Sequence, residues 1–151
     1  MEKFAFILHP LSLQDMEHLS PLMRYIPDPI IEACLKMKKP FKVSHITGIK
    51  SPYAEAEGWF IGCPLTAKQM VELPEEFVMD RIIESGKVAQ ELGAKIVGLG
   101  AFTSIVGDAG ITVAKNLDIA VTSGNSYTVA TAIQGTKQAA RMMGKDLKEC
   151  R

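Results

Sequence analysis

The 151-residue sequence lacks the features that mark several specialised classes of protein. It has three widely spaced cysteines with no Cys-x-x-Cys pair, and no apolar run near the roughly 20 residues that cross a bilayer. Lys and Arg together number 17, as do Asp and Glu, so no net charge draws the chain to a polyanion. These absences argue against a disulfide framework, a membrane span and non-specific nucleic-acid binding.

What is present has the composition of one globular domain, with 47% apolar and 23% charged residues. The apolar start of the chain is too short for a signal-peptide core. Unpaired cysteines are typical of a reducing compartment. We therefore expect a cytoplasmic protein.

The hydrophobic pattern predicts an α/β fold. Strands are expected at 4–8, 41–49, 57–63, 95–99 and 118–122, and helices at 12–25, 30–37, 74–92, 108–117 and 125–143. Because helices and strands alternate in the second half, we expect a small, mostly parallel sheet flanked by helices, with an added antiparallel strand pair. That pair, between 41 and 61, is a plausible edge for self-association.

The first candidate motif is a glycine-rich segment, 98–107, directly after a predicted strand. A dinucleotide-binding fingerprint needs a third glycine, and Thr103 occupies that place. Two hydroxyls, those of Thr103 and Ser104, remain on a loop at the carboxyl end of a strand, where α/β folds bind ligands. The alternative is a tight connection in which one of these hydroxyls caps a helix.

The second candidate motif, 122–128, is rich in hydrogen-bonding side chains and lies where a strand ends and a helix begins. The free N–H groups of a helix start favour an anionic or carbonyl oxygen. If the strands are parallel, both loops leave the same edge of the sheet and line one cleft. We expect the substrate-binding residues there to be Thr103, Ser104, Ser123, Gly124, Asn125, Ser126, Thr128 and His9.

The remaining candidates are weaker. His9 ends a strand near the expected cleft, whereas His45 alternates with apolar residues and is interpreted as a core or interface histidine rather than an acid or base. Cys63 has no neighbouring base, so packing is its expected role. The spacing of His and Cys gives no metal site. A small hydrolase using Ser104 with His9 or His45 is a further possibility.

These loops resemble those of a known family. The segments 98–105 and 122–128, with the opening 6–12, are similar to the N-terminal region of acyl-[acyl-carrier-protein] reductases and their shikimate-dehydrogenase-like relatives, the predicted amino-acid dehydrogenases. The resemblance implies the substrate-side domain of a two-domain NADP-dependent oxidoreductase whose Rossmann domain binds the cofactor. No Asn-Val-Thr-x-Pro-x-Lys segment is present, which argues against shikimate itself as substrate.

On this interpretation residues 1–144 form the substrate-side α/β domain and 145–151 are a linker to a Rossmann domain that is absent from the chain. The expected function is binding of a small-molecule or acyl substrate for an NAD(P)-dependent oxidoreductase, with no cofactor bound by this chain alone. Its expected partner is the C-terminal Rossmann domain, and a homo-oligomer is possible. The rival hypothesis is a stand-alone module for small-ligand binding or self-association, without catalysis.

Overall fold

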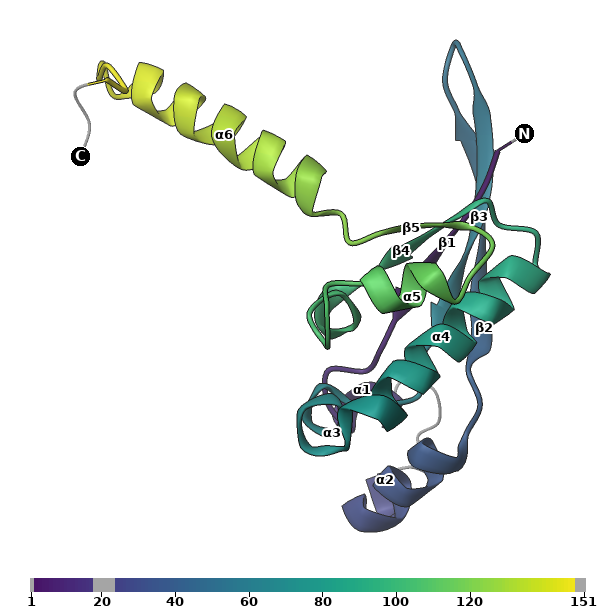
Figure 1. Ribbon diagram of the computed structural model, residues 1–151. Coiled ribbons are helices and arrows are strands. Elements are labelled where there is room, and N and C mark those ends of the chain that lie inside the picture. The colour runs from purple at the N-terminus through teal and green to yellow at the C-terminus, as the bar shows by residue number, and fades with distance from the viewer. Residues whose placement is uncertain (1, 18–23, 149–151) are drawn as a thin grey trace.

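The computed structural model describes residues 2–17 and 24–148. Figure 1 shows a sheet with helices packed on it and one helix that projects away. The elements, in chain order, are β1 (Glu2–Leu8), α1 (Gln14–Glu17), α2 (Asp28–Met37), β2 (Phe41–Lys50), β3 (Glu55–Gly62), α3 (Ala67–Glu72), α4 (Glu75–Glu91), β4 (Ile96–Leu99), the 3₁₀ helix η2 (Ala101–Ser104), α5 (Ile111–Lys115), β5 (Ala120–Thr122) and α6 (Asn125–Met142).

The five strands form one mixed sheet in the order β2-β3-β1-β4-β5. β1 pairs in parallel with β3 and β4, and β4 pairs in parallel with β5, whereas β2 is antiparallel to β3. This confirms the predicted α/β fold with a mostly parallel sheet and an added antiparallel pair. Since four strands point the same way, their carboxyl ends form one edge of the sheet, which we call the carboxyl edge.

One face of the sheet is covered by helices, and we call it the covered face. Ala5 and Ile7 of β1 are 2% and 0% exposed, and Val97 of β4 is 0% exposed. α4 packs there because its apolar residues recur every three or four positions, which places them on one side of the helix. Gly86 lets the segment between α5 and β5 pack closely against α4, since a methyl group at that position would clash with the side chain of Leu117. The core therefore lies between the sheet and α4.

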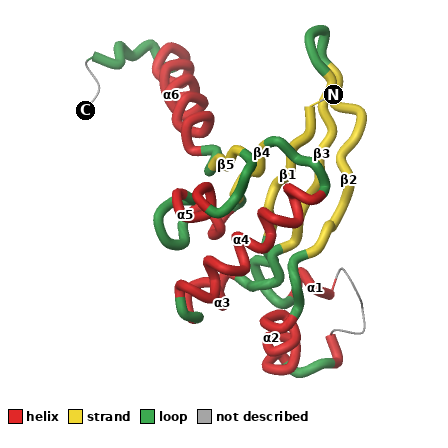
Figure 2. Tube along the Cα trace, turned by 45° about the vertical axis from the view of Figure 1, so that its right-hand side comes forward, coloured by secondary structure: helices red, strands yellow, loops and turns green. Residues whose placement is uncertain are grey.

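The opposite face carries no helix in the described part of the chain, and we call it the open face. Figure 2 places α3, α4 and α5 on one side of the strands, with the other side uncovered. Alternate residues of the same strands are correspondingly accessible: Phe6 and Leu8 are each 37% exposed and Ile96 is 40% exposed. Successive side chains of a strand point to opposite faces of the sheet. Buried and accessible residues therefore alternate along these strands.

Aromatic rings cover part of the open face by lying over glycines of neighbouring strands. A methyl group at Gly98 would lie 2.6 Å from Cδ2 of Phe6, and one at Gly58 would lie 2.7 Å from Cε2 of Phe4. At Gly100 it would lie 2.7 Å from Cε1 of Phe6. At these three positions glycine is therefore needed to leave room for the rings of Phe4 and Phe6.

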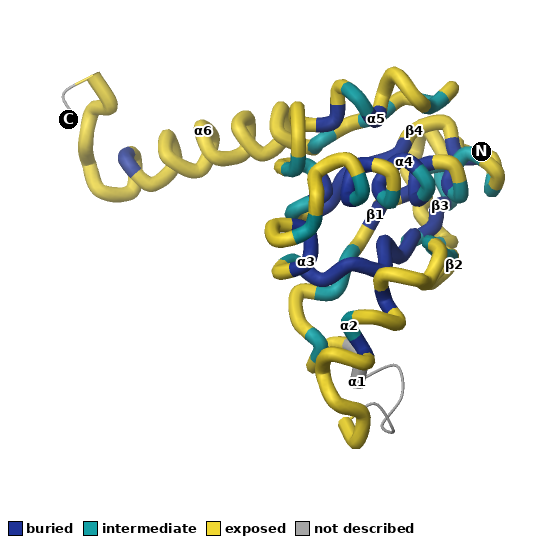
Figure 3. The backbone as a smooth tube through the Cα atoms, turned by 60° about the horizontal axis from the view of Figure 1, so that its bottom comes forward, coloured by how far each residue is buried: buried dark blue, intermediate teal, exposed yellow. Residues whose placement is uncertain are grey.

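α6 extends away from the sheet after β5. Of its described residues Ala140 alone is buried, while Tyr127 is 78% and Ile133 is 50% exposed (Figure 3). Gly124 is the cap residue just before the helix, and its φ of 74° is the left-handed conformation that glycine adopts without strain.

Several elements differ from the sequence prediction. α3 was not predicted, although Thr66 and Gln69 form a capping box in which the N–H of Gln69 donates to Oγ1 of Thr66 at 3.2 Å. α5 is shorter than the predicted 108–117 because Ala109 and Gly110 both have positive φ, which a helix cannot contain. Of the predicted helix 12–25, residues 14–17 are α-helical, and residues 18–23 lie outside the described part of the chain.

β2 is an outer strand of the sheet, and its pairing with β3 is irregular. The register shifts between Lys42 and Ser44 and again between Ile46 and Ile49. The ladder between β2 and β3 is therefore divided into three short runs, of which the central one spans Ser44 to Ile46. Within the described residues, no helix combines the length and hydropathy of a membrane span.

Candidate functional site

The carboxyl edge brings together segments that are far apart in the sequence. His9 follows β1, Cys63 follows β3, the glycine-rich segment 98–107 includes the end of β4, and the polar segment 122–128 includes the end of β5. Since β4 and β5 are parallel neighbours, both polar loops begin at this edge. The edge is therefore the first place to look for a binding site.

The first loop uses its hydroxyls locally. Thr103 is buried, and its Oγ1 donates to the carbonyl oxygen of Gly100 at 2.7 Å. Ser104 likewise donates through Oγ to the carbonyl of Ala101 at 2.7 Å. These bonds hold the 3₁₀ turn of η2. The alternative of a tight connection is thus supported, but its helix cap was wrong, because the side chain of neither residue accepts a hydrogen bond from the start of a helix. The hydroxyl of Thr103 is inaccessible to a ligand in this conformation.

The second loop is more open. The N–H of Gly124 donates to Oγ1 of Thr122 at 3.2 Å, and Oγ1 of Thr128 donates to the carbonyl of Gly124 at 3.1 Å. Asn125 and Ser126 are exposed in the first turn of α6, and the neighbouring Ser123 is half-buried. Neither Thr103 nor Asn125 lines any of the cavities described below. A substrate-binding role for this loop stays a prediction.

His9 connects β1 to η2. Its Nε2 accepts a hydrogen bond from the backbone N–H of Phe102 at 3.2 Å, so the proton must reside on Nδ1, which lies 3.1 Å from the carbonyl of its neighbour Pro10. The imidazole also packs edge-on against the ring of Phe102, with centroids 5.9 Å apart. Both ring nitrogens of His9 are thus engaged by the backbone.

An apolar cavity of about 300 Å³ opens beside His9, and we call it the carboxyl-edge cavity. It lies where the loop after β1, the end of β3 and the start of β2 meet. Its floor is at Gly62, where a methyl group would lie 3.0 Å from Cγ2 of Val43 and 3.1 Å from Cζ of Phe41. The lining residues are Leu8, His9, Pro10, Asp15, Leu35, Phe41, Val43, Gly62, Cys63 and Pro64.

Two ionisable groups other than His9 belong to this cavity. Asp15 accepts the backbone N–H groups of Leu11 and Ser12 through Oδ2, at 2.8 and 3.0 Å. Burial raises the pKa of the Cys63 thiol to about 11, an effect that hydrogen bonds with Ser85 and Leu65 only partly offset. Since the thiolate is the nucleophilic form, this cysteine is unreactive near neutral pH, in agreement with its expected packing role.

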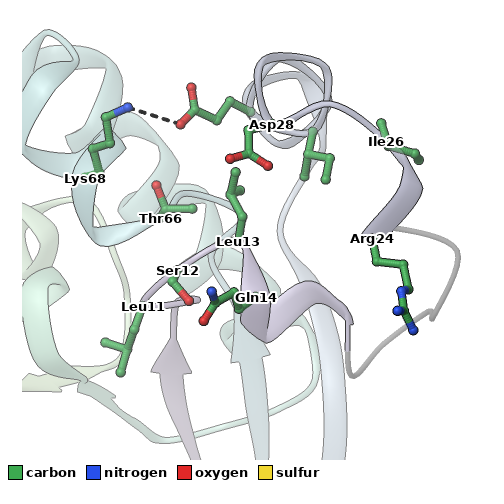
Figure 4. A pocket seen from close by; sticks show the side chains of 11 residues that line it. Leu11, Ser12, Leu13, Gln14, Arg24, Ile26, Asp28, Thr66 and Lys68 are labelled. Atoms are coloured by element: carbon green, nitrogen blue, oxygen red, sulfur yellow. Dashed lines mark hydrogen bonds and ion pairs between the residues drawn. The ribbon is translucent and has the colours of Figure 1, made fainter.

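A second cavity, of about 510 Å³, lies between α1, α2 and the start of α3 (Figure 4). Its walls are more polar, and they include Lys68, whose Nζ lies 3.4 Å from Oε1 of Glu32. The lining residues are Leu11, Ser12, Leu13, Gln14, Arg24, Ile26, Asp28, Ile31, Glu32, Thr66 and Lys68. The cavity thus contains charges of both signs, of which Lys68 and Glu32 form an ion pair.

His45 lies on β2, opposite Trp59 in the middle of β3 and three strands away from β4. It is exposed rather than in the core, with Nε2 3.2 Å from Oε2 of Glu57 and its ring stacked on Trp59 at 5.4 Å between centroids. Lys3 also pairs with Glu57, at 3.4 Å. A hydrolase that joins Ser104 to His45 is therefore excluded by their places in the fold. Among the described residues no group of His, Cys, Asp and Glu could hold a metal ion.

No known protein-family model matches the sequence. The chain is 35% identical over 97 residues to the aminotransferase PigE of Serratia sp. strain ATCC 39006. The match includes 64% of this chain but 11% of that protein, so the chain spans about a tenth of the length of this curated relative.

This comparison contradicts the predicted NAD(P)-dependent oxidoreductase, because the relative is named for amino transfer. The resemblance to acyl-[acyl-carrier-protein] reductases and shikimate-dehydrogenase-like proteins depended on two short loops. One of them owes its glycines to the packing of Phe6, and Thr103 holds a local turn. Its motif therefore reflects the geometry of this sheet rather than the chemistry of hydride transfer.

Proposed function

We propose that this chain is a substrate-binding domain of a larger biosynthetic protein related to aminotransferases. The observation that carries the proposal is the 35% identity to aminotransferase PigE, a protein of which the chain spans only 11%. A domain of this size within a long enzyme contributes one part of the activity. The carboxyl-edge cavity supports binding of a small molecule as the contribution of this domain.

The described residues do not fit the cofactor of amino transfer. Pyridoxal phosphate requires a lysine that forms a Schiff base through its neutral amine. Lys68 is a described lysine that lines a cavity, beside acidic groups. Its side chain is 62% exposed, and its Nζ lies 3.4 Å from Glu32 and 3.9 Å from Glu72, so it is an ion-paired surface lysine rather than one enclosed in an apolar site. We therefore assign the chain no role in holding this cofactor.

The carboxyl-edge cavity has the character of a small-molecule site. Ligand pockets are concave and mostly apolar, with a few polar groups that orient the ligand, and their volumes begin near 300 Å³. Here Leu8, Phe41 and Val43 supply apolar walls, while Asp15 supplies a carboxylate. Its place at the carboxyl ends of parallel strands is the usual one in α/β folds.

Binding can be tested by following backbone amide signals in NMR spectra while 1-hexanol is added. We expect the shifted signals to belong to residues around the cavity, such as Leu8 and Gly62. Val43→Trp, which fills the cavity, should reduce the affinity at least tenfold. Ile49→Trp is the matched control, because Ile49 is 45% exposed, like Val43 at 46%, but lies further along β2. Unchanged binding to Val43→Trp would exclude this cavity.

The link to amino transfer is tested in the longer relative. Deleting the matched stretch from aminotransferase PigE should weaken its use of substrate, and inserting this chain in its place should restore part of that use. Steady-state kinetics of amino transfer give the readout. If the deletion changes neither KM nor kcat, the matched stretch is not a substrate-binding domain.

A further inference from the structure

The walls of the carboxyl-edge cavity also indicate which chemical group its ligand carries. Among the described residues that line it, Asp15 is the only acidic or basic one apart from His9. His9 donates through Nδ1 and accepts through Nε2, so both of its nitrogens are occupied by the backbone. The thiol of Cys63 faces the core beside Ser85. Asp15 is therefore the charged group of the lining itself, while the ammonium of Lys38, which is not part of the lining, lies over the ring of Phe41 at 4.1 Å.

The carboxylate of Asp15 is oriented by hydrogen bonds to one of its two oxygens, Oδ2. Its hydrogen bonds to the described chain, from the N–H groups of Leu11 and Ser12, use Oδ2 alone. These bonds fix the orientation of the carboxylate, while an ionised carboxylate accepts about four hydrogen bonds in all. Oδ1 is thus an oriented acceptor at the rim of an apolar cavity.

We propose that the carboxyl-edge cavity selects small apolar primary amines, with the ammonium group bound by Asp15 and the hydrocarbon part held between Leu8, Phe41 and Val43. A cation at the rim pairs with the carboxylate, and a ligand carboxylate there is repelled. The inference rests on the proposed function and deepens it, since amino transfer forms or consumes an amine.

Hydrocarbon length sets the affinity and the end group sets the selectivity. Each methylene buried against the apolar walls should raise the affinity roughly fourfold. The volume of about 300 Å³ leaves room for an aliphatic chain of about six carbons or for one ring. Compounds that share a chain and differ at the end group therefore separate these two contributions.

The test compares hexylamine, 1-hexanol and hexanoate at neutral pH, with affinities measured from NMR titrations of the chain. We expect hexylamine to bind at least tenfold more tightly than 1-hexanol, and hexanoate to bind most weakly. Asp15→Asn should bring hexylamine to the level of 1-hexanol, because the amide still accepts the N–H groups of Leu11 and Ser12 but carries no charge. Asp28→Asn, at the second cavity, is the control and should keep the preference.

The possible results separate the two proposals. Equal binding of hexylamine and 1-hexanol by the unaltered chain would overturn the amine selectivity and leave the substrate-binding domain standing. The same holds if the preference for hexylamine survives Asp15→Asn. If none of the three compounds shifts the cavity signals, the proposed function and this inference fail together.

Discussion

The two faces of the sheet solve the same packing problem in different ways. On the covered face, aliphatic residues such as Ile7 and Val97 interlock with α4 and are fully buried. On the open face, the rings of Phe4 and Phe6 lie against glycines of adjacent strands and stay partly accessible. Parallel sheets are usually covered by helices on both sides. The comparison teaches that a sheet can shield one face in part with its own side chains.

The same contrast separates stability from binding. The covered face holds the core cluster, which includes the unreactive thiol of Cys63. The open face ends in the carboxyl-edge cavity, where Leu8 and Val43 keep apolar surface accessible to a ligand. Substitutions on the covered face should therefore reduce stability, and those on the open face should act more on binding.

The largest effect is expected from truncating adjacent residues of β1. Ile7→Ala, which empties a site that is 0% exposed, should lower the free energy of unfolding by about 3 kcal/mol. Leu8→Ala, at a site that is 37% exposed, should cost about 1 kcal/mol, because less apolar surface is lost from contact. Urea unfolding measures both. Equal costs would show that the open face is packed as tightly as the covered one.

The next effect is the pH dependence that the covered face gives through Cys63. Folding raises the pKa of this thiol from about 9.0 to about 11, so the native state keeps its proton longer than the unfolded state. The stabilisation is complete below about pH 9 and is lost as the pH rises through about 11. Wild type should therefore lose more unfolding free energy than Cys63→Ala over that interval. Parallel curves for the two proteins would count against the shift.

A third prediction concerns the glycines of the open face against which the phenylalanine rings pack. Gly100→Ala should destabilise the protein by about 2 kcal/mol, because the new methyl group would lie 2.5 Å from the carbonyl oxygen of Ile7. Gly135→Ala is the control, since Gly135 has no atom within 4 Å of the added carbon and lies within α6. There alanine should stabilise the helix by up to about 1 kcal/mol. Thermal unfolding followed by circular dichroism distinguishes the two.

The smallest effect is the coupling between Phe6 and Gly98. Gly98→Ala places a methyl group against the Phe6 ring, and the partly exposed ring can turn aside at a cost of about 1 kcal/mol. Removing the ring first, with Phe6→Ala, should cancel this cost. A double-mutant cycle measures the coupling free energy. Additive costs would mean that the ring does not depend on the glycine.

Much of the fold followed from local patterns. The long helix α4, with Pro74 ahead of it and acidic residues in its first turn, and the buried strand at Ile96–Leu99 both lie where the sequence predicts them. α3 was missed even though Thr66 and Gln69 carry a recognisable capping signal. Local propensity and periodicity act within a few residues, so they fix elements well.

The candidate site depended on contacts that no local pattern contains. The glycines at 98 and 100 suggested a ligand loop, but their neighbour Phe6 lies more than ninety residues earlier in the chain. Alternation assigned His45 to the core or an interface; the core assignment was wrong, because β2 is an outer strand and the imidazole is exposed, and the interface assignment stays a prediction. The carboxyl-edge cavity joins Asp15 to residues of β2 and β3, so only the tertiary fold reveals it.

The irregular outer strand β2 has a consequence for the behaviour of the protein at high concentration. An unpaired strand edge is a template on which copies of a chain can stack into filaments. The two register shifts of β2 divide its ladder into short runs, the central one spanning Ser44 to Ile46. A newly arriving strand could add few bonds before the pattern fails. The bulges should therefore slow the growth of fibrils. A deletion that removed a bulge and made the pairing of β2 regular should make fibril growth faster.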